Sequence, residues 1–200
     1  MDPNSFINHI KSKQKALQDL AKRKLPVLIG RMAKDHFQNN FRQSGFLNNG
    51  LHKWKPTRRQ QQPSSAASTS YGPLFSSRNH LFSSIQYIPG DYNVVVTNSV
   101  IYAPIHNYGG TINRTIHPKV TPNMRRFSWA MFYKSGGKEA AKQENSAAAM
   151  WRAMALTKKQ TLTIKQTINI PQRQFIGESK ELTDKISSTI YQQVKSTLEL

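Results

Sequence analysis

Two short blocks rich in proline, glycine and aromatic residues constrain the fold more than any other part of the sequence. Residues 101–110 read Ile-Tyr-Ala-Pro-Ile-His-Asn-Tyr-Gly-Gly, and residues 170–177 read Ile-Pro-Gln-Arg-Gln-Phe-Ile-Gly. Proline fixes one backbone angle and glycine reaches positive φ angles, so each block predicts a rigid backbone corner. Aromatic and apolar side chains in the blocks serve as anchors. Such corners suit a part that must fit other parts, and neither block holds the residues of a catalytic site.

Apolar residues recur at helical spacing at both ends of the chain. Residues 1–44 predict N-terminal helices, with Pro26 in the first turn of the second one. Residues 178–199 predict a C-terminal helix, because apolar residues recur there mostly at four-residue intervals. Ala, Met, Glu, Gln and Lys, which favour helices, fill residues 138–159, and this segment predicts a helical insertion.

Between these helices, β-branched segments alternate with turn residues. Strands are predicted over residues 85–88 and 92–97, which form a hairpin, and over 111–116, 125–133 and 161–170. The polar stretch 57–72 holds too little apolar area to offset the cost of ordering and predicts a flexible loop. We therefore expect residues 1–200 to form a single α+β domain. Its mostly antiparallel sheet of about four to five strands is flanked by N-terminal, inserted and C-terminal helices.

The chain is strongly basic, with 29 Lys and Arg residues against 10 Asp and Glu residues and a formal net charge of +19. Such an excess attracts polyanions. Two interpretations stay open: assembly against an acidic protein neighbour, and proximity to nucleic acid. The candidate nucleic-acid-facing residues are Arg58, Arg59, Arg125 and Arg126. No apolar run approaches the roughly 18–20 residues that a membrane span requires, so we expect no membrane partner.

The residues that catalysis requires are sparse. The chain has no cysteine, which excludes disulfides, thiolate zinc sites and cysteine nucleophiles. Between His36 and Lys138 the only carboxylate is Asp91, which lies in a turn sequence, so paired-carboxylate hydrolysis has no candidates there. The histidines lack the spacing of metal ligands, and the Gly109-Gly110 pair lacks a phosphate-loop lysine. We expect a protein that is not an enzyme, with no catalytic residue, no metal and no cofactor.

A set of motifs, taken in order, resembles the phage virion-morphogenesis (tail-completion) family. The set comprises Phe37-Gln38-Asn39-Asn40-Phe41, Gly50, Trp54-Lys55-Pro56, Leu74, Leu81, Ser84-Ile85, Val94-Val95-Val96, the two blocks and a terminal helix. The match runs from about Lys22 over nearly the whole remaining chain. Arg78-Asn79 stands where the family usually shows Thr-Gly, and residues 138–159 resemble an insertion into the family pattern.

The resemblance implies a small α+β structural subunit of the virion that forms a ring, expected to be a hexamer. This ring would cap the tail tube as a tail terminator and join the tail to the head–neck complex. The implied partners are further copies of the chain, the tail tube protein, neck or connector proteins, and DNA that passes through the ring. The implied location is the tail–neck junction of a virion assembled in the bacterial host cytoplasm. The alternative is a basic nucleic-acid-binding module or a neck (head-completion) ring that contacts DNA.

Interface residues are expected at the two corners. They are Tyr102, His106, Tyr108, Gly109 and Gly110 in the first block, Pro171, Arg173 and Phe175 in the second, and Trp54, which anchors the loop between them. Arg173 is the strongest candidate to face a partner, because its planar guanidinium suits a carboxylate on an adjoining subunit. For Trp54 and Gly109, maintenance of the fold is an equal alternative.

Overall fold

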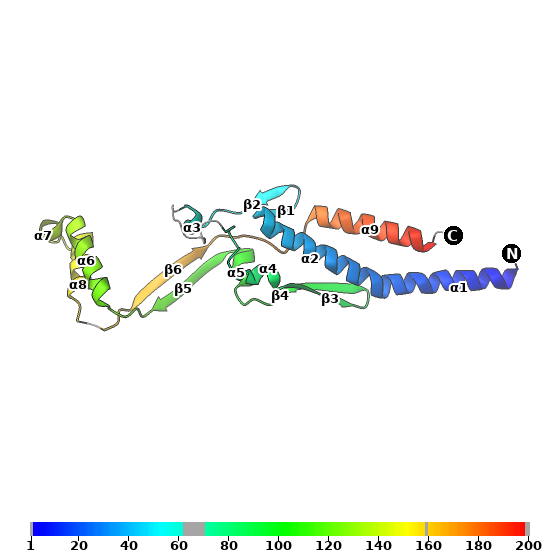
Figure 1. Cartoon of the computed structure of the whole chain (residues 1–200), viewed down its shortest axis with the longest axis horizontal. Helices are drawn as coiled ribbons and strands as arrows, with labels where there is room; N and C mark the ends of the chain where they lie inside the picture. The colour runs from blue at the N-terminus through cyan, green and yellow to red at the C-terminus, as the bar shows by residue number, and fades with distance from the viewer. Residues whose placement is uncertain (1, 62–70, 159, 199–200) are drawn as a thin grey trace. The chain divides into compact units, whose positions relative to one another are not determined.

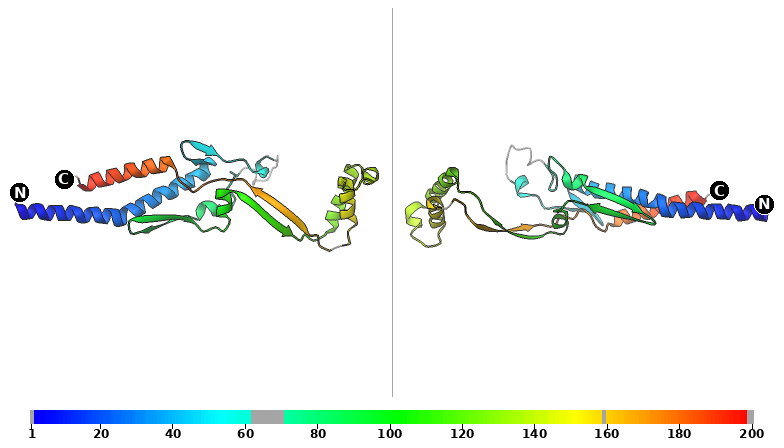
Figure 2. Two further views of the ribbon diagram at one scale, coloured as in Figure 1. Left: turned by 180° about the vertical axis from the view of Figure 1, so that it is seen from behind. Right: turned by 90° about the horizontal axis from the view of Figure 1, so that it is seen from below.

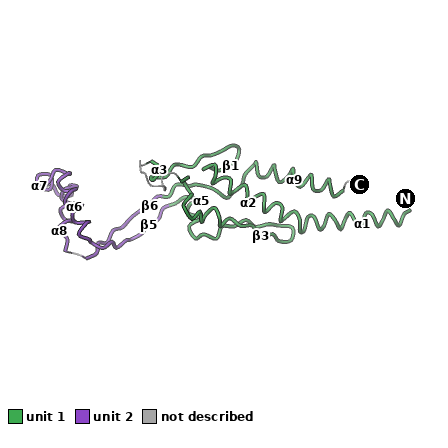
Figure 3. The backbone as a smooth tube through the Cα atoms, viewed as in Figure 1, with its two compact units in different colours: residues 1–110, 170–200 green, residues 111–169 purple. Residues whose placement is uncertain are grey.

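The computed structural model describes residues 2–61, 71–158 and 160–198. They group into two compact units (Figure 3). Unit 1 comprises Met1–Gly110 and Ile170–Leu200, and unit 2 is the continuous segment Thr111–Asn169. The chain leaves unit 1 after the first block, forms unit 2, and re-enters unit 1 at the second block.

Unit 1 begins with helices α1 (Pro3–Asp19) and α2 (Leu25–Gln43), which run end to end through a π-helical turn at Leu20–Lys24 (Figures 1 and 2). Pro26 explains the turn: its ring cannot donate a hydrogen bond and would collide with the carbonyl four residues earlier. That carbonyl, of Lys22, instead accepts a hydrogen bond from the N–H of Tyr92 at 3.3 Å. The proline thus redirects a helix carbonyl toward the neighbouring hairpin.

The predicted hairpin consists of β3 (Ile85–Gly90) and β4 (Asn93–Asn98), which pair antiparallel with Ile85 opposite Asn98. It packs against α2. Gly30 of α2 permits this contact, because a Cβ atom at that position would lie 2.4 Å from a ring carbon of Tyr87. A larger residue on this face of α2 would separate the helix from the hairpin.

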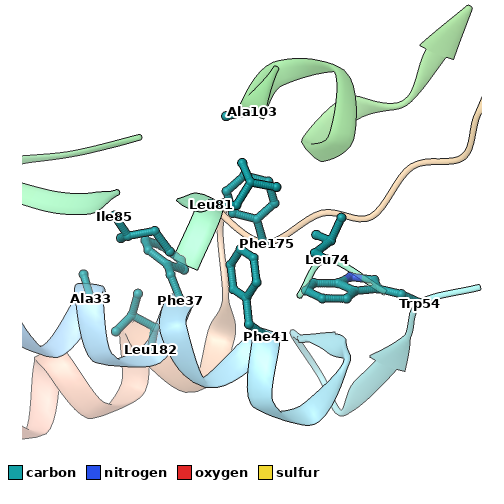
Figure 4. Packing of buried hydrophobic residues seen from close by; sticks show 10 residues of the cluster. All are labelled: Ala33, Phe37, Phe41, Trp54, Leu74, Leu81, Ile85, Ala103, Phe175 and Leu182. Carbon is teal, nitrogen blue, oxygen red and sulfur yellow. The ribbon is translucent and has the colours of Figure 1, made fainter. Parts of the chain in front are cut away.

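The remaining elements of unit 1 close around its core. They are the β1 (Gly45–Leu47) and β2 (Leu51–Lys53) hairpin, the short helices α3 (Arg58–Gln61), α4 (His80–Ser83) and α5 (Ala103–Tyr108), and the C-terminal helix α9 (Lys180–Leu198). Phe41 and Phe175, almost fully buried, lie at the centre of this core with ring centroids 5.0 Å apart (Figure 4). Most of the polar loop predicted over 57–72, namely residues 62–70, lies outside the described residues.

Unit 2 combines a two-stranded ribbon with a helical hairpin. The ribbon pairs β5 (Gly110–Ile116) with β6 (Ile164–Ile170), of which Gly110 and Ile170 count with unit 1. The helices are α6 (Pro122–Lys134), α7 (Gly137–Ala140) and α8 (Ala147–Leu156), and α6 packs against α8.

Two predictions of secondary structure were wrong. The described strands form three separate two-stranded pairs, not one sheet of four to five strands. Residues 125–133, predicted as a strand, lie in helix α6. The helix start explains the error: the Thr121 hydroxyl accepts a hydrogen bond from the Met124 N–H at 3.2 Å, and Pro122 occupies the first turn. These capping signals outweigh the partial apolar alternation that follows. The α+β class itself is confirmed, with helices the larger part.

Candidate functional site: the junction of the two blocks

The two sequence blocks meet inside unit 1, as α5 and an extended segment that precedes α9. The N–H of Arg173 donates a 2.8 Å hydrogen bond to the carbonyl of His106. Gly109 has a φ of +73°, and a Cβ atom there would lie 2.8 Å from the backbone nitrogen of Gln172. Glycine is therefore required twice over, by the backbone angle and by the close approach of the second block.

Asn107 joins the blocks most directly. Its side chain is 6% exposed. Its Oδ1 accepts hydrogen bonds from the N–H groups of Phe175 (2.9 Å) and Ile176 (3.0 Å), and its Nδ2 donates to the Ile176 carbonyl at 3.0 Å. One amide thus satisfies three backbone groups of the other block. Asn107 was absent from the predicted interface residues, although a lone amide among the aromatic and apolar residues of the first block is the signal that would have identified it.

Asn40 of α2 holds the same segment from the opposite side. It is fully buried, and its Nδ2 donates to the Phe175 carbonyl at 3.2 Å while its Oδ1 accepts from the Leu47 N–H at 3.2 Å. Both backbone polar groups of Phe175 are therefore paired with side-chain amides. Because a buried backbone group without a partner is costly, these two asparagines allow an irregular segment to cross the core.

Phe175 and Trp54 both point into the core of unit 1 (Figure 4). Phe175 is 1% exposed, and the Trp54 ring lies edge-on to Phe41 with centroids 5.5 Å apart. The Trp54 indole N–H donates to the Gln174 carbonyl at 2.9 Å. Both side chains therefore anchor the junction from within.

Arg173 also lies inside unit 1, although we expected it to face a partner. Its side chain is buried, and its Nε and Nη2 donate to the Lys55 carbonyl at 3.1 and 2.9 Å. The planar guanidinium thus binds a carbonyl of its own chain. Burial lowers the pKa of this guanidinium.

His106 is half-buried, with its ring edge-on to Tyr102 at 5.9 Å between centroids. Its Nδ1 has no hydrogen-bond partner among the described residues. Burial lowers the pKa of His106, and the positive charge of Arg173 lowers it further. Both effects favour the neutral form of the ring. It lines an open cavity of about 170 Å³ together with Arg59 and His80.

The outer side of the first block exposes large apolar surfaces. Tyr102 and Tyr108 are 44% and 74% exposed, and Ile101, which sequence reasoning did not select, is 94% exposed. Gly110 and Pro171 are exposed as well. The predicted interface residues therefore divide into an inner group, which holds the corner together, and an outer group, which faces away from the chain.

The arginines selected as nucleic-acid-facing are divided between the two units. Arg58 and Arg59 belong to unit 1, whereas the exposed Arg125 and Arg126 belong to α6 of unit 2. The Nη2 of Arg59 donates to the carbonyls of Gly72 (2.9 Å) and Phe75 (2.7 Å), so this side chain ties a loop together. Within the described part of the chain, no group of three metal-ligating side chains is found and no helix is both long and apolar enough to cross a membrane.

Comparison with known proteins identifies one family. The model of the phage virion morphogenesis family matches residues 8–195, which covers both blocks, α2, unit 2 and most of α9. No curated protein and no solved structure matches the chain.

Proposed function

This chain belongs to the phage virion morphogenesis family, and we propose that it is a structural subunit that forms a ring at the tail–neck junction of the virion. In this proposal, copies of the chain form a hexamer that caps the tail tube and joins the tail to the neck or connector proteins. The chain acts by fitting its neighbours and not as an enzyme, and DNA passes through the ring.

The outward side of the first block carries this proposal. Ile101, Tyr102 and Tyr108 expose apolar surface on a corner whose inner side is held by buried hydrogen bonds. Burial of such side chains by a partner stabilises the complex by roughly 25 cal/mol per Å² of apolar surface that is removed from water. Because the corner is rigid, little conformational entropy is lost on contact. An identical surface on each copy suits a heterologous contact that repeats until a ring closes.

The proposal is tested by mass measurement of the purified protein under native conditions. A ring gives a discrete multiple of the 22.8 kDa chain mass, expected to be sixfold. The double variant Ile101→Ser, Tyr108→Ser removes the exposed apolar surface and should shift the mass to that of the monomer. Tyr191→Ser is the matched control, because it removes a tyrosine of similar exposure (65%) from α9. Immunogold labelling of virions should place the protein at the tail–neck junction.

A wild-type protein that stays monomeric at micromolar concentration and is absent from virions would contradict the ring. Equal loss of assembly in the corner variant and in the α9 variant would contradict the assignment of the contact to the first block.

The second candidate, contact with nucleic acid, is favoured by the charge of unit 2. Residues 111–169 contain eleven Lys and Arg residues, two Glu residues and no Asp. Binding to phosphates releases counterions, so the affinity for duplex DNA should fall steeply and linearly on logarithmic axes as salt rises. Arg125→Gln with Arg126→Gln should reduce that slope by about 2. An unchanged slope would show that Arg125 and Arg126 of α6 do not contact DNA phosphates.

A further inference from the structure

A groove beside the second block is lined by cationic, amide and aromatic side chains. Its volume is about 390 Å³, and it lies between the β1–β2 hairpin and the segment that contains Gln172 and Gln174. His52, Lys53 and Lys55 line it as well, and all three are exposed. No carboxylate is among the residues that line this groove. Its side chains therefore favour a ligand with negative charge.

The adjacent strand β2 has a free edge, which follows from the pairing of the hairpin. The Trp54 N–H donates to the Ser44 carbonyl, and Phe46 pairs with His52. Hydrogen-bonded and non-hydrogen-bonded pairs alternate along an antiparallel ladder, so the pairs of Leu51 and Lys53 are the non-hydrogen-bonded ones. The N–H and C=O groups of these two residues consequently point away from β1, and the described residues provide no hydrogen bond to them.

A free strand edge accepts an extended peptide, because its N–H and C=O groups alternate at the spacing of another strand. Phosphates and bases do not offer that alternation. The Trp54 ring is also only 8% exposed, so it is closed to base stacking. These observations favour a protein segment over nucleic acid as the occupant of the groove.

We propose that an extended acidic segment of a neighbouring virion protein lies in this groove and adds to the free edge of β2 as a third strand. The identity of the partner as a virion protein rests on the proposed function. The binding itself depends only on the groove, on the cations that line it and on the backbone groups of Leu51 and Lys53. A segment with its carboxylates on the side of Lys53 and Lys55 would meet both of these cations.

The test uses the full chain and a fluorescein-labelled peptide of alternating Glu and Val, with binding followed by fluorescence anisotropy at about 150 mM salt. We expect saturable binding, and no binding of the peptide in which Lys replaces Glu. Two further peptides carry N-methyl groups, one on every valine and one on every glutamate. Strand addition uses one edge of the peptide, so one of these two should lose affinity by at least about tenfold. Undiminished binding of both methylated peptides overturns the strand addition.

Charge reversal in the groove provides a matched pair of variants. Lys53→Glu with Lys55→Glu should weaken binding by about tenfold or more, because repulsion replaces attraction at the contact. Lys11→Glu with Lys15→Glu makes the same change in net charge on exposed positions of α1 and should change the affinity by less than about twofold. Equal losses of affinity in both double variants would show that the peptide binds through general attraction to a basic protein, and would overturn the proposed site. Displacement of the peptide by an equally charged single-stranded oligonucleotide, with the same loss in both pairs, would overturn the proposal in favour of nucleic acid.

The native mass of the same samples separates this inference from the ring. A ring that forms without binding the Glu-Val peptide refutes the groove and leaves the proposed function standing. Peptide binding by a wild-type protein that never assembles supports the groove and refutes the ring.

Discussion

Asn107→Ala is expected to destabilise unit 1 more than any other single truncation of a polar side chain at the junction. The asparagine is 6% exposed and pairs with the N–H groups of Phe175 and Ile176 and with the Ile176 carbonyl. Alanine leaves all three backbone groups without a partner. An unpaired buried polar group costs about 1–3 kcal/mol, and the Ile176 groups are only partly buried, so we expect a total loss of about 3–5 kcal/mol.

The assay is urea unfolding observed through Trp54 alone. Trp129 and Trp151 lie in unit 2, and their replacement by phenylalanine leaves Trp54, whose indole donates to the Gln174 carbonyl, as the only tryptophan. Its emission then reports the unfolding of the junction. With a slope of about 2 kcal/mol per M, the expected loss lowers the urea midpoint by about 2 M. The measurement is made at a protein concentration where both variants are monomeric, because assembly would add apparent stability.

The matched control is Asn48→Ala in the same tryptophan background. Asn48 also uses its Oδ1 to accept a backbone N–H, from Lys180 at 3.0 Å, but that bond is exposed and water can replace it. Its loss should cost no more than about 0.5–1 kcal/mol. If Asn107→Ala costs as little as Asn48→Ala while the protein stays folded, the junction does not depend on this amide, and the account of how the two blocks are held together is wrong.

Three further outcomes can be checked by the same titration. Gly109→Ala should cost about 1–3 kcal/mol, more than Gly50→Ala, because both glycines have positive φ but only at Gly109 would the new Cβ also meet backbone; equal costs would argue against the close approach. Arg173→Lys should cost about 1–2 kcal/mol, since an ammonium cannot reproduce the two-pronged bond to a carbonyl. Burial lowers the pKa values of His36 and His106, so below about pH 6.5 the unfolded chain binds protons that the folded chain does not, and stability should fall from pH 7 to pH 5. His36→Gln should make that fall shallower, and an unchanged fall would exclude His36 as a cause.

Elements with a strong local signal could be predicted from the sequence. The apolar stripe of α2, the hairpin of β3 and β4, and the C-terminal helix depend on spacing and turn residues that are visible in the chain. The error at residues 125–133 arose because aromatic residues there alternate over a short run, whereas the start of α6 is decided by the Thr121 cap and by Pro122. Local sequence patterns could not show that the strands form separate pairs and not a single sheet, because strand pairing depends on contacts between residues far apart in sequence.

The sequence identified most residues of the candidate site, but it did not indicate which side chains point into the core and which point to solvent. The two blocks do meet, as rigid corners with anchors. The direction of Arg173 could not be predicted, because its fork suits a carboxylate on a partner as well as the Lys55 carbonyl. The choice depends on which acceptor groups the fold brings within reach of the guanidinium. Asn107 was missed for the same reason, since its value depends on the backbone groups of a segment more than sixty residues away.

Substitutions in the inner group and in the outer group of the corner should have different effects on stability and on assembly. Inner residues such as Asn107 and Phe175 hold the backbone, so their loss lowers the stability of the isolated chain and, through it, every contact that the corner makes. Outer residues such as Ile101 and Tyr108 contribute little to the isolated chain because solvent already surrounds them. A defect in assembly at an unchanged urea midpoint therefore points to the outer group. A defect in both points to the inner group, whose loss alone is not evidence of contact with another subunit.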